Sequence, residues 1–311
     1  MSVDPHASPP ADPVVTCYRH PDRRAGVSCQ RCGRPVCPSC MVQASVGFQC
    51  PECVKQAAKK SPVITARSLA TRQPYVTYGL MALNVAAFLA ILSHGGNLGG
   101  GGGRLSDNLS LVAAGPFATN SGLYGAHVGV AHGYQWYRLF TGGFVHYGII
   151  HLGLNMFVLW IIGSQLERVL GGVRYLALYV TCLAAGSFAV MLASPGEVTA
   201  GASGAIFGLM GAAASYQRSR GISLLQSGLG ALIVLNLVFS FTISGISVAG
   251  HIGGLVGGLV VGWLVFQLEG RVRSEWVAAA MCGAVTVALV FGGIWAANQF
   301  AATGHAVIQL R

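Results

Sequence analysis

Seven long apolar runs constrain this chain more than any other feature. About 17–25 apolar residues span a bilayer as a helix, and a segment in lipid must bond all its backbone polar groups internally. Only 9% of the residues are charged, against about 25% in soluble domains. We therefore expect an all-α polytopic membrane protein. The predicted spans are residues 75–92, 146–164, 175–193, 202–217, 223–241, 247–267 and 277–297, of which the fourth is short and rich in Gly and Ala.

The distribution of Lys and Arg gives these spans a direction. Cytoplasmic loops carry an excess of Lys and Arg. With the N-terminus inside, 16 of the 19 basic residues lie on the cytoplasmic side, and Arg104, Arg138 and Arg311 lie outside. We expect a cytoplasmic N-terminus, an external C-terminus and a long external loop over residues 93–145. The net charge of +10 then reflects membrane topology, and nucleic acid is not an expected partner.

Two polar residues stand at the predicted outer ends of apolar spans. Ser203 lies in the sequence Gly-Ala-Ser-Gly at the start of the fourth span, and His251 lies near the start of the sixth. A hydroxyl and an imidazole are costly at membrane depth unless they have partners or a function. Both spans run from outside to inside, so the two side chains lie at similar depth. Ser203 is the candidate nucleophile and His251 the candidate general base.

The second span adds two more polar side chains at this depth. His151 and Asn155 are four residues apart and so share one helix face. They are candidate hydrogen-bond donors to an oxyanion, together with the backbone N–H of Ser203. Each residue alone has a structural interpretation, because Ser, Asn and His in membrane helices often bond to the backbone or join helices. Their coincidence at one depth favours catalysis. His146, one turn outward of His151, is ambiguous, and a structural or loop-anchoring role is favoured over a functional one.

A Ser–His pair at membrane depth suggests a protease that cuts other proteins inside the membrane. Rival intramembrane protease chemistries lack the residues that they require. There is no Lys after residue 60, and the last Asp is Asp107, so a Ser–Lys dyad and a pair of intramembrane Asp residues are excluded. The zinc-protease pattern His-Glu-x-x-His is absent. The expected machinery is a Ser–His dyad with no catalytic cofactor. Glycines at four-residue intervals, including Gly254 and Gly258, would let the fourth and sixth spans approach closely.

In order and spacing these residues resemble the rhomboid family of intramembrane serine proteases. The resemblance runs from Trp136 to Leu268 and is carried by the motifs around Trp136 and Arg138, His151 and Asn155, Gly163 and Glu167, Gly201 and Ser203, and Gly250 to Gly258. It implies a six-helix core followed by a seventh transmembrane helix. It also implies that Ser203 and His251 are catalytic and that His151 and Asn155 form the oxyanion hole.

The resemblance suggests roles for further residues. Glu167 would be a structural hydrogen-bonding residue, and Trp136 and Arg138 would belong to an interfacial external loop. Phe207 occupies a position where an aromatic ring often lies against the catalytic histidine. The implied substrates are single-span membrane proteins, cut near the outer face of the bilayer. The alternative is a non-catalytic membrane scaffold that binds client helices; a transporter is a weaker interpretation, because no inverted repeat is evident.

The N-terminal segment carries eight soft metal ligands in four closely spaced pairs. In a reducing compartment disulfides are disfavoured, and eight ligands suffice for two tetrahedral zinc sites. With no open position, both ions would be structural, and they would supply the folding energy of a very small module. The ligands are Cys17, His20, Cys29, Cys32, Cys37, Cys40, Cys50 and Cys53.

The spacing of these ligands resembles a B-box-type zinc finger. That resemblance implies a crossed pairing, in which Cys17, His20, Cys37 and Cys40 hold one ion and the other four hold the second. Sequential pairing is the alternative. A cytosolic protein is the expected partner of this module.

The chain is therefore divided into five parts. They are a disordered N-terminus (1–16), the zinc module (17–53), a basic juxtamembrane linker (54–73), the protease core (74–268), and the seventh span with a short external tail (269–311). The abundance of Gly and Ala points to a bacterial plasma membrane as the location.

Overall fold

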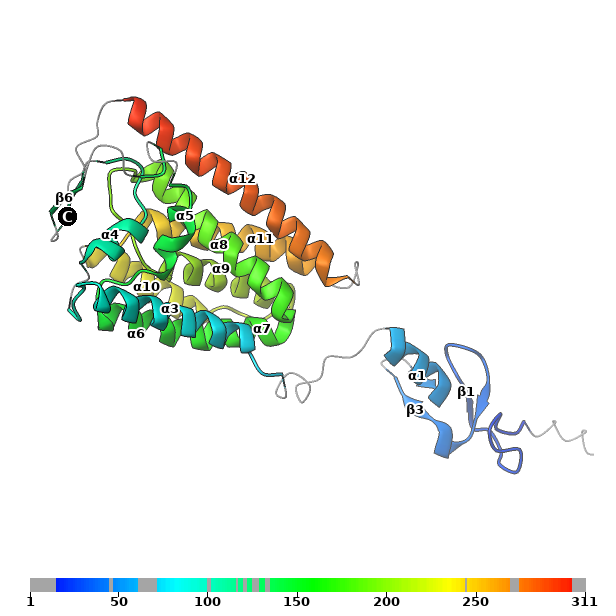
Figure 1. Cartoon of the computed structure of the whole chain (residues 1–311). Helices are drawn as coiled ribbons and strands as arrows, with labels where there is room; N and C mark the ends of the chain where they lie inside the picture. The colour runs from blue at the N-terminus through cyan, green and yellow to red at the C-terminus, as the bar shows by residue number, and fades with distance from the viewer. Residues whose placement is uncertain are drawn as a thin grey trace, which may run out of the picture. The chain divides into compact units, whose positions relative to one another are not determined.

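The computed structural model describes two compact units, Met1–Leu69 and Ala70–Arg311 (Figure 1). Residues 1–14 of the predicted disordered N-terminus, most of the basic linker and the external tail after residue 303 lie outside the described residues, whereas Thr16 pairs with Arg24 in a β-bridge and is ordered. The described residues are 15–44, 47–60, 72–99, 102–115, 117–119, 122–124, 129–131, 135–243, 245–268 and 274–303.

The first unit is a small module with a core made largely of cysteine. It contains two antiparallel two-stranded sheets, in which Val27 pairs with Val36 and Val42 pairs with Gln49. Its buried core consists of Val36 and six cysteines, too little apolar surface to fold without a further source of stability. Its elements are β1 (Val27–Ser28), β2 (Pro35–Val36), η1 (Pro38–Cys40), β3 (Val42–Gln43), β4 (Phe48–Gln49) and α1 (Pro51–Lys60).

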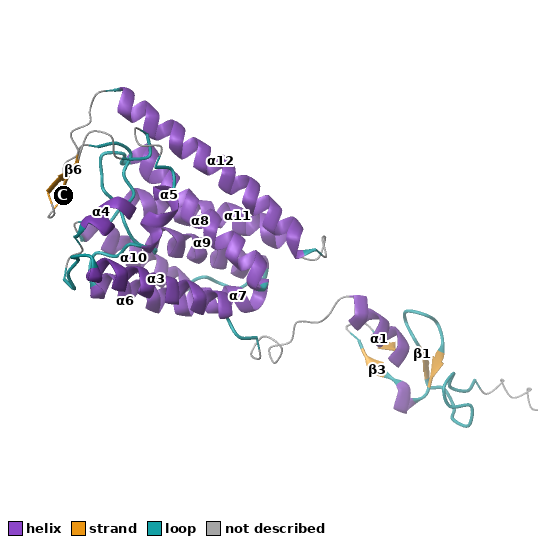
Figure 2. Ribbon diagram, in the orientation of Figure 1, coloured by secondary structure: helices purple, strands orange, loops and turns teal. Residues whose placement is uncertain are grey.

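The second unit is a bundle of apolar helices (Figure 2). Its long helices are α3 (Tyr75–Ser93), α6 (Ile149–Val158), α7 (Ser164–Leu170), α8 (Gly172–Ala193), α9 (Ser203–Ser219), α10 (Leu229–Thr242), α11 (Val248–Leu268) and α12 (Glu275–Ala302). Its shorter elements are α4 (Arg104–Leu109), β5 (Phe117–Thr119), β6 (Gly122–Tyr124), α5 (Arg138–Thr141), the 3-10 turn η2 (Gly142–Phe144) and the π-helical turn η3 (Leu159–Gly163), which joins α6 to α7.

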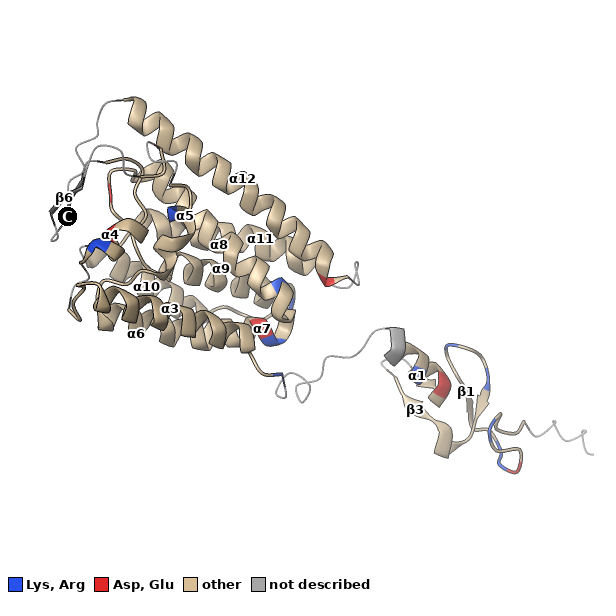
Figure 3. Ribbon diagram, viewed as in Figure 1, with Lys and Arg blue, Asp and Glu red and all other residues tan. Residues whose placement is uncertain are grey.

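Each of the seven predicted spans contains a helix. In the described residues, five helical segments are long and apolar enough to cross a membrane, among them the continuous run Ile149–Leu170. The helix α10 is apolar but shorter, and α9, with 17 residues, is about 26 Å long. Charged residues lie mainly at helix ends and in loops (Figure 3). The predicted fold class, an all-α polytopic membrane protein, is confirmed.

Two helix boundaries differ from the prediction because glycine sets them. The second span begins at Ile149, after Gly148 with a φ of +111°, and not at residue 146. The fifth begins at Leu229, after Gly228 with a φ of +76°, and not at residue 223. Residues other than glycine rarely adopt these conformations, so both helices start later than their apolar composition indicates.

The helix α9 lies in the middle of the bundle. Every residue from 205 to 212 is buried, because Gly and Ala let neighbouring backbones approach closely. Close contacts between α9 and α11 occur at glycines of α11, where a Cβ atom would collide with α9. Gly254 faces Gly204, Gly258 faces Gly208, and Gly262 faces Ala212. The numbers rise together, so the two helices are parallel and their first turns lie at the same end of the bundle.

Candidate active site and metal clusters

Ser203 is the first residue of α9, and the glycine two positions before it fixes how the helix begins. Gly201 has a φ of +124°, a conformation that an L side chain rarely adopts. A Cβ atom at this position would also lie 2.9 Å from the His151 ring. The sequence Gly-Ala-Ser-Gly therefore turns the chain into α9 and leaves room for the imidazole of His151.

His251 lies in the first turn of α11 and is 6% exposed. Its Nε2 atom is 2.7 Å from Ser203 Oγ. The Phe207 ring, one turn along α9 from Ser203, stacks on the imidazole with a centroid distance of 4.2 Å and an interplanar angle of 21°. The parallel packing of α9 and α11 thus brings the nucleophile and base candidates into hydrogen-bond contact, although 48 residues separate them.

The other two predicted polar residues line the same cavity as Ser203 and His251. This cavity has a volume of about 660 Å³ and is lined mainly by apolar side chains from α6, α9 and α10. His151 and Asn155 face it from α6, and Asn155 Nδ2 donates a hydrogen bond of 2.8 Å to the His151 carbonyl. Four polar side chains from three helices therefore border one largely apolar space.

His146 lies in the turn before α6 and not on the helix itself. Its side chain is fully buried, and Nδ1 is 3.3 Å from the Phe144 carbonyl oxygen. The ring meets that of His151 edge-on, with a centroid distance of 5.1 Å. His146 therefore packs against His151 but does not itself line the cavity.

Sequence reasoning missed one polar residue at the site, Ser240 on α10. Its Oγ atom is 2.6 Å from His251 Nδ1, and its side chain is 3% exposed. The only signal in the sequence is a serine in an apolar span, which usually bonds to its own backbone. Nothing in the local pattern indicates that α10 would lie against His251.

Glu167 fixes the start of α3. Its carboxylate accepts hydrogen bonds from the backbone N–H groups of Val76 (2.9 Å) and Thr77 (2.7 Å), and from the Thr77 hydroxyl (2.7 Å). The first N–H groups of a helix lack partners within it, and a negative charge at this end is favourable. Next to it, the side chains of Arg72 and Arg168 each bond to the other's backbone carbonyl at 3.3 Å.

Trp136 and Arg138 differ in exposure. Trp136 is 53% exposed, whereas Arg138 is fully buried. The guanidinium of Arg138 donates to the backbone carbonyls of Asp107 and Ser110, each at 2.7 Å. Arg138 therefore holds the chain around α4 against α5, while Trp136 lies at the surface of the helical unit.

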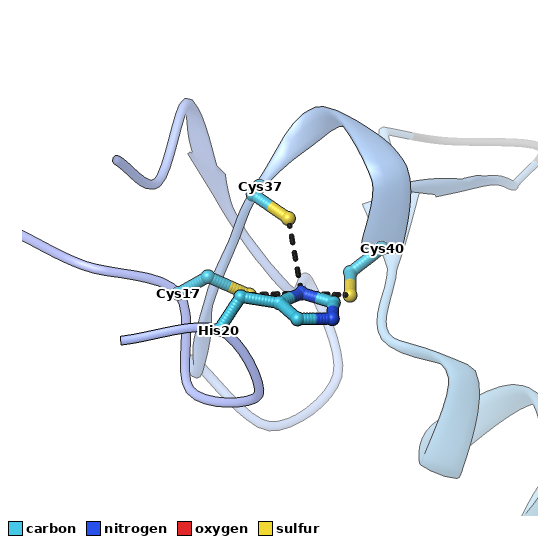
Figure 4. Close-up of side chains that lie close together, drawn as sticks. All are labelled: Cys17, His20, Cys37 and Cys40. Carbon is cyan, nitrogen blue, oxygen red and sulfur yellow. Dashed lines mark hydrogen bonds between the residues drawn. The ribbon is translucent and has the colours of Figure 1, made fainter. Parts of the chain in front are cut away.

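The eight predicted metal ligands form two clusters. One contains Cys17, His20, Cys37 and Cys40, and the other contains Cys29, Cys32, Cys50 and Cys53, with the ligand atoms of each within 4.8 Å of one another. The ligands are grouped in the crossed order and not the sequential one. Figure 4 shows the first cluster, in which the three sulfur atoms surround the Nδ1 atom of His20.

The spacing of the ligand atoms suits zinc. His20 Nδ1 lies 3.3, 3.5 and 3.9 Å from the sulfurs of Cys40, Cys37 and Cys17. In the second cluster, Cys32 Sγ is 3.7 Å from Cys50 Sγ. Tetrahedral zinc with bonds of about 2.3 Å to sulfur and 2.0 Å to nitrogen separates its ligands by about 3.5–3.8 Å. Both donor sets are of the Cys-rich kind found in structural zinc sites.

Without metal, the environment of the clusters favours the thiolate at some cysteines and the thiol at others. Burial acts to raise the pKa of Cys17, but hydrogen bonds from nearby backbone groups lower it to about 6. Cys29 behaves in the same way, with a pKa of about 6. Burial and the neighbouring sulfurs raise the pKa of Cys40 to about 11. The thiolate is the form that binds metal, and a cation would relieve the repulsion among the sulfurs.

Fold and site together define a multi-pass integral membrane protein with a Ser–His pair inside its helix bundle. The family model of the Rhomboid domain matches residues 133–268. Rhomboid protease GluP of Bacillus subtilis is 36% identical over 186 residues, which are 59% of this chain and 33% of that protein.

Two further relatives extend the comparison. The Bacillus subtilis protein named "Putative rhomboid protease YdcA" is 34% identical over 151 residues, which are 47% of this chain and 75% of that protein. RHOMBOID-like protein 6, mitochondrial, of Arabidopsis thaliana is 33% identical over 141 residues, 44% of this chain and 46% of that protein. The chain thus spans about a third of GluP and three quarters of YdcA. It belongs to the rhomboid family.

Proposed function

We propose that this protein is an intramembrane serine endopeptidase with Ser203 as nucleophile and His251 as general base. The observation that carries the proposal is the 2.7 Å contact between Ser203 Oγ and His251 Nε2 at a largely apolar cavity. Membership of the rhomboid family and relatives named as proteases support it. The non-catalytic scaffold remains an outcome that the experiment below would reveal.

The proposed reaction uses the pair in two stages. His251 Nε2 takes the hydroxyl proton as Ser203 Oγ attacks the scissile carbonyl, and the imidazolium returns that proton to the leaving amine. Water then attacks the acyl-enzyme, again through His251, and releases Ser203. His151, Asn155 and the backbone N–H of Ser203 are the proposed donors to the oxyanion. One such donor is worth about 3–4 kcal/mol of the barrier.

The proposed substrates are single-span membrane proteins. The cavity offers mainly apolar walls from α6, α9 and α10, which suit the side chains of a transmembrane segment. A helical backbone hides its carbonyls from a nucleophile, so helix-destabilising Gly, Pro or polar residues at the cleaved site should help. The proposed orientation, with a cytoplasmic N-terminus in a bacterial plasma membrane, places the cut near the outer face.

The test compares purified full-length variants on a single-span substrate. Ser203→Ala and His251→Ala should abolish cleavage and labelling by a fluorophosphonate probe, while the wild type is active. Ser219→Ala is a matched control, because Ser219 lies at the far end of the same helix and its exposed hydroxyl bonds to the Tyr216 carbonyl. Cleavage by Ser203→Ala at the wild-type rate would refute the proposal and favour a scaffold.

We propose further that residues 17–53 form a B-box-type module with two structural zinc ions in the crossed pairing. The ligand spacing and the lowered pKa of Cys17 and Cys29 support this. The module would dock a cytosolic protein. Metal analysis of the purified chain should give two zinc ions per molecule, and Cys37→Ala should lower the count. A metal-free, folded module would contradict the proposal.

A further inference from the structure

Ser240 is buried where the rest of its helix is not. Of the 14 residues of α10, only Leu229 and Ser240 are buried, and the neighbours Phe239 and Phe241 are 46% and 67% exposed. Lipid accommodates the two phenylalanines, whereas the small serine is the side chain that packs against the bundle. This packing places the Ser240 hydroxyl 2.6 Å from His251 Nδ1.

One assignment of protons satisfies both contacts of the Ser240 hydroxyl at once. The Ser240 hydroxyl has one hydrogen, which it donates to the Asn236 carbonyl at 2.7 Å. Toward His251 Nδ1, at 2.6 Å, its oxygen can then only accept. The hydrogen of the neutral imidazole thus lies on Nδ1, which leaves the Nε2 lone pair facing Ser203.

The stacked ring of Phe207 cannot make this selection. Stacking at 4.2 Å holds the plane of the imidazole, but a flat apolar face does not distinguish the two ring nitrogens. It also does not distinguish the ring from the same ring turned by 180° about the Cβ–Cγ bond, which occupies the same plane. A hydroxyl acceptor at Nδ1 opposes the flip and fixes the tautomer, which is the role of the carboxylate in a Ser–His–Asp triad.

We propose that Ser240 is a positioning residue that fixes the tautomer and the in-plane orientation of His251. This inference rests on the proposed protease function. When His251 takes the Ser203 proton, both ring nitrogens carry hydrogens, and Ser240 Oγ continues to accept from Nδ1–H. The acceptor is neutral, so its contribution is smaller than that of a buried carboxylate. Because Ser240 lies on α10, the orientation of the base depends on where that helix sits.

The test measures kcat and KM of full-length variants on one transmembrane substrate. Ser240→Ala and the similar-sized but weakly accepting Ser240→Cys should lower kcat about 10- to 100-fold and leave KM within about twofold. Ser240→Thr restores a hydroxyl and should recover most of the rate. Thr242→Ala is the matched control, because the exposed Thr242 hydroxyl bonds to the Val238 carbonyl on the same helix.

Each outcome decides the matter. The inference is overturned if Ser240→Ala keeps the wild-type kcat, if Ser240→Thr is as slow as Ser240→Ala, or if Thr242→Ala loses as much activity. The inference is supported if a fluorophosphonate labels Ser203 slowly in Ser240→Ala and Ser240→Cys but at the normal rate in Ser240→Thr and Thr242→Ala. A wild type that neither cleaves nor labels would instead refute the proposed function. The two failures are therefore distinguishable.

Discussion

A methyl group at Gly258 tests how α9 and α11 hold the candidate site together. The Cβ of an alanine there would lie 2.6 Å from the Gly208 Cα and closer still to its carbonyl oxygen. Carbon atoms rest about 3.5–4.0 Å apart and the carbonyl oxygen is nearer still, so the helices must separate by at least about 1 Å. The bond of 2.7 Å between Ser203 and His251 would then lengthen to about 3.7 Å, outside hydrogen-bond range.

We expect Gly258→Ala to lower kcat/KM about 100-fold and the free energy of unfolding by about 1–3 kcal/mol. The assays are cleavage of a single-span substrate and thermal unfolding of the purified protein in detergent. Gly254→Ala should behave similarly, since its added Cβ would lie 2.9 Å from the Gly204 carbonyl carbon.

The control for helix packing is Gly283→Ala on α12. An added Cβ there has no neighbour within 4 Å, so both activity and stability should be retained. The reasoning is wrong if Gly258→Ala unfolds at the wild-type temperature with full activity. It is equally wrong if Gly283→Ala is as damaging as Gly258→Ala, because the effect would then not depend on the contact between α9 and α11.

Three further predictions concern the metal clusters and the start of α3. Removal of zinc with a chelator should unfold residues 17–53 and leave the apolar helices intact, as seen by proteolysis and circular dichroism. Acid should also release zinc, because protons compete with the metal for the thiolates. Without metal, the pKa of Cys17 and Cys29 is lowered from 9.0 to about 6 on folding, so the stability that they contribute is complete above pH 9 and is lost as the pH falls through 6. Bound zinc holds the thiolates further into acid, so zinc retention should fall only below pH 6, and a pH-independent zinc content down to pH 4 would contradict this. Glu167→Ala should cost about 3 kcal/mol because three donors lose their acceptor, and Glu167→Gln about half as much, measured by thermal unfolding against the exposed Glu275→Ala.

The sequence predicts the helices well because lipid leaves few alternatives. Long apolar runs must be helical, and the parallel direction of the fourth and sixth spans follows from counting crossings. Helix starts are predicted less well, since hydropathy does not register a glycine turn. Leu225 belongs to an apolar run but is 82% exposed before α10 begins.

Contacts between distant loops and helices were beyond sequence reasoning. The burial of Arg138 depends on backbone carbonyls around α4, which no side-chain pattern reveals. The contact of Ser240 with His251 depends on where α10 packs. The sequence motifs identify polar residues that are rare in membrane spans, such as His and Asn. A serine in a span is common and usually bonds to its own helix backbone, so Ser240 gives no such signal.

The entry of the chain into the helical unit has a mechanical consequence. Glu167 holds Val76 and Thr77, and Arg72 and Arg168 bond to each other's backbones a few residues earlier. A force applied to the chain on the N-terminal side of Arg72 would load these hydrogen bonds before it reached α3. A partner bound to the proposed docking module would therefore load these hydrogen bonds first, and the start of α3 would move only after they had broken.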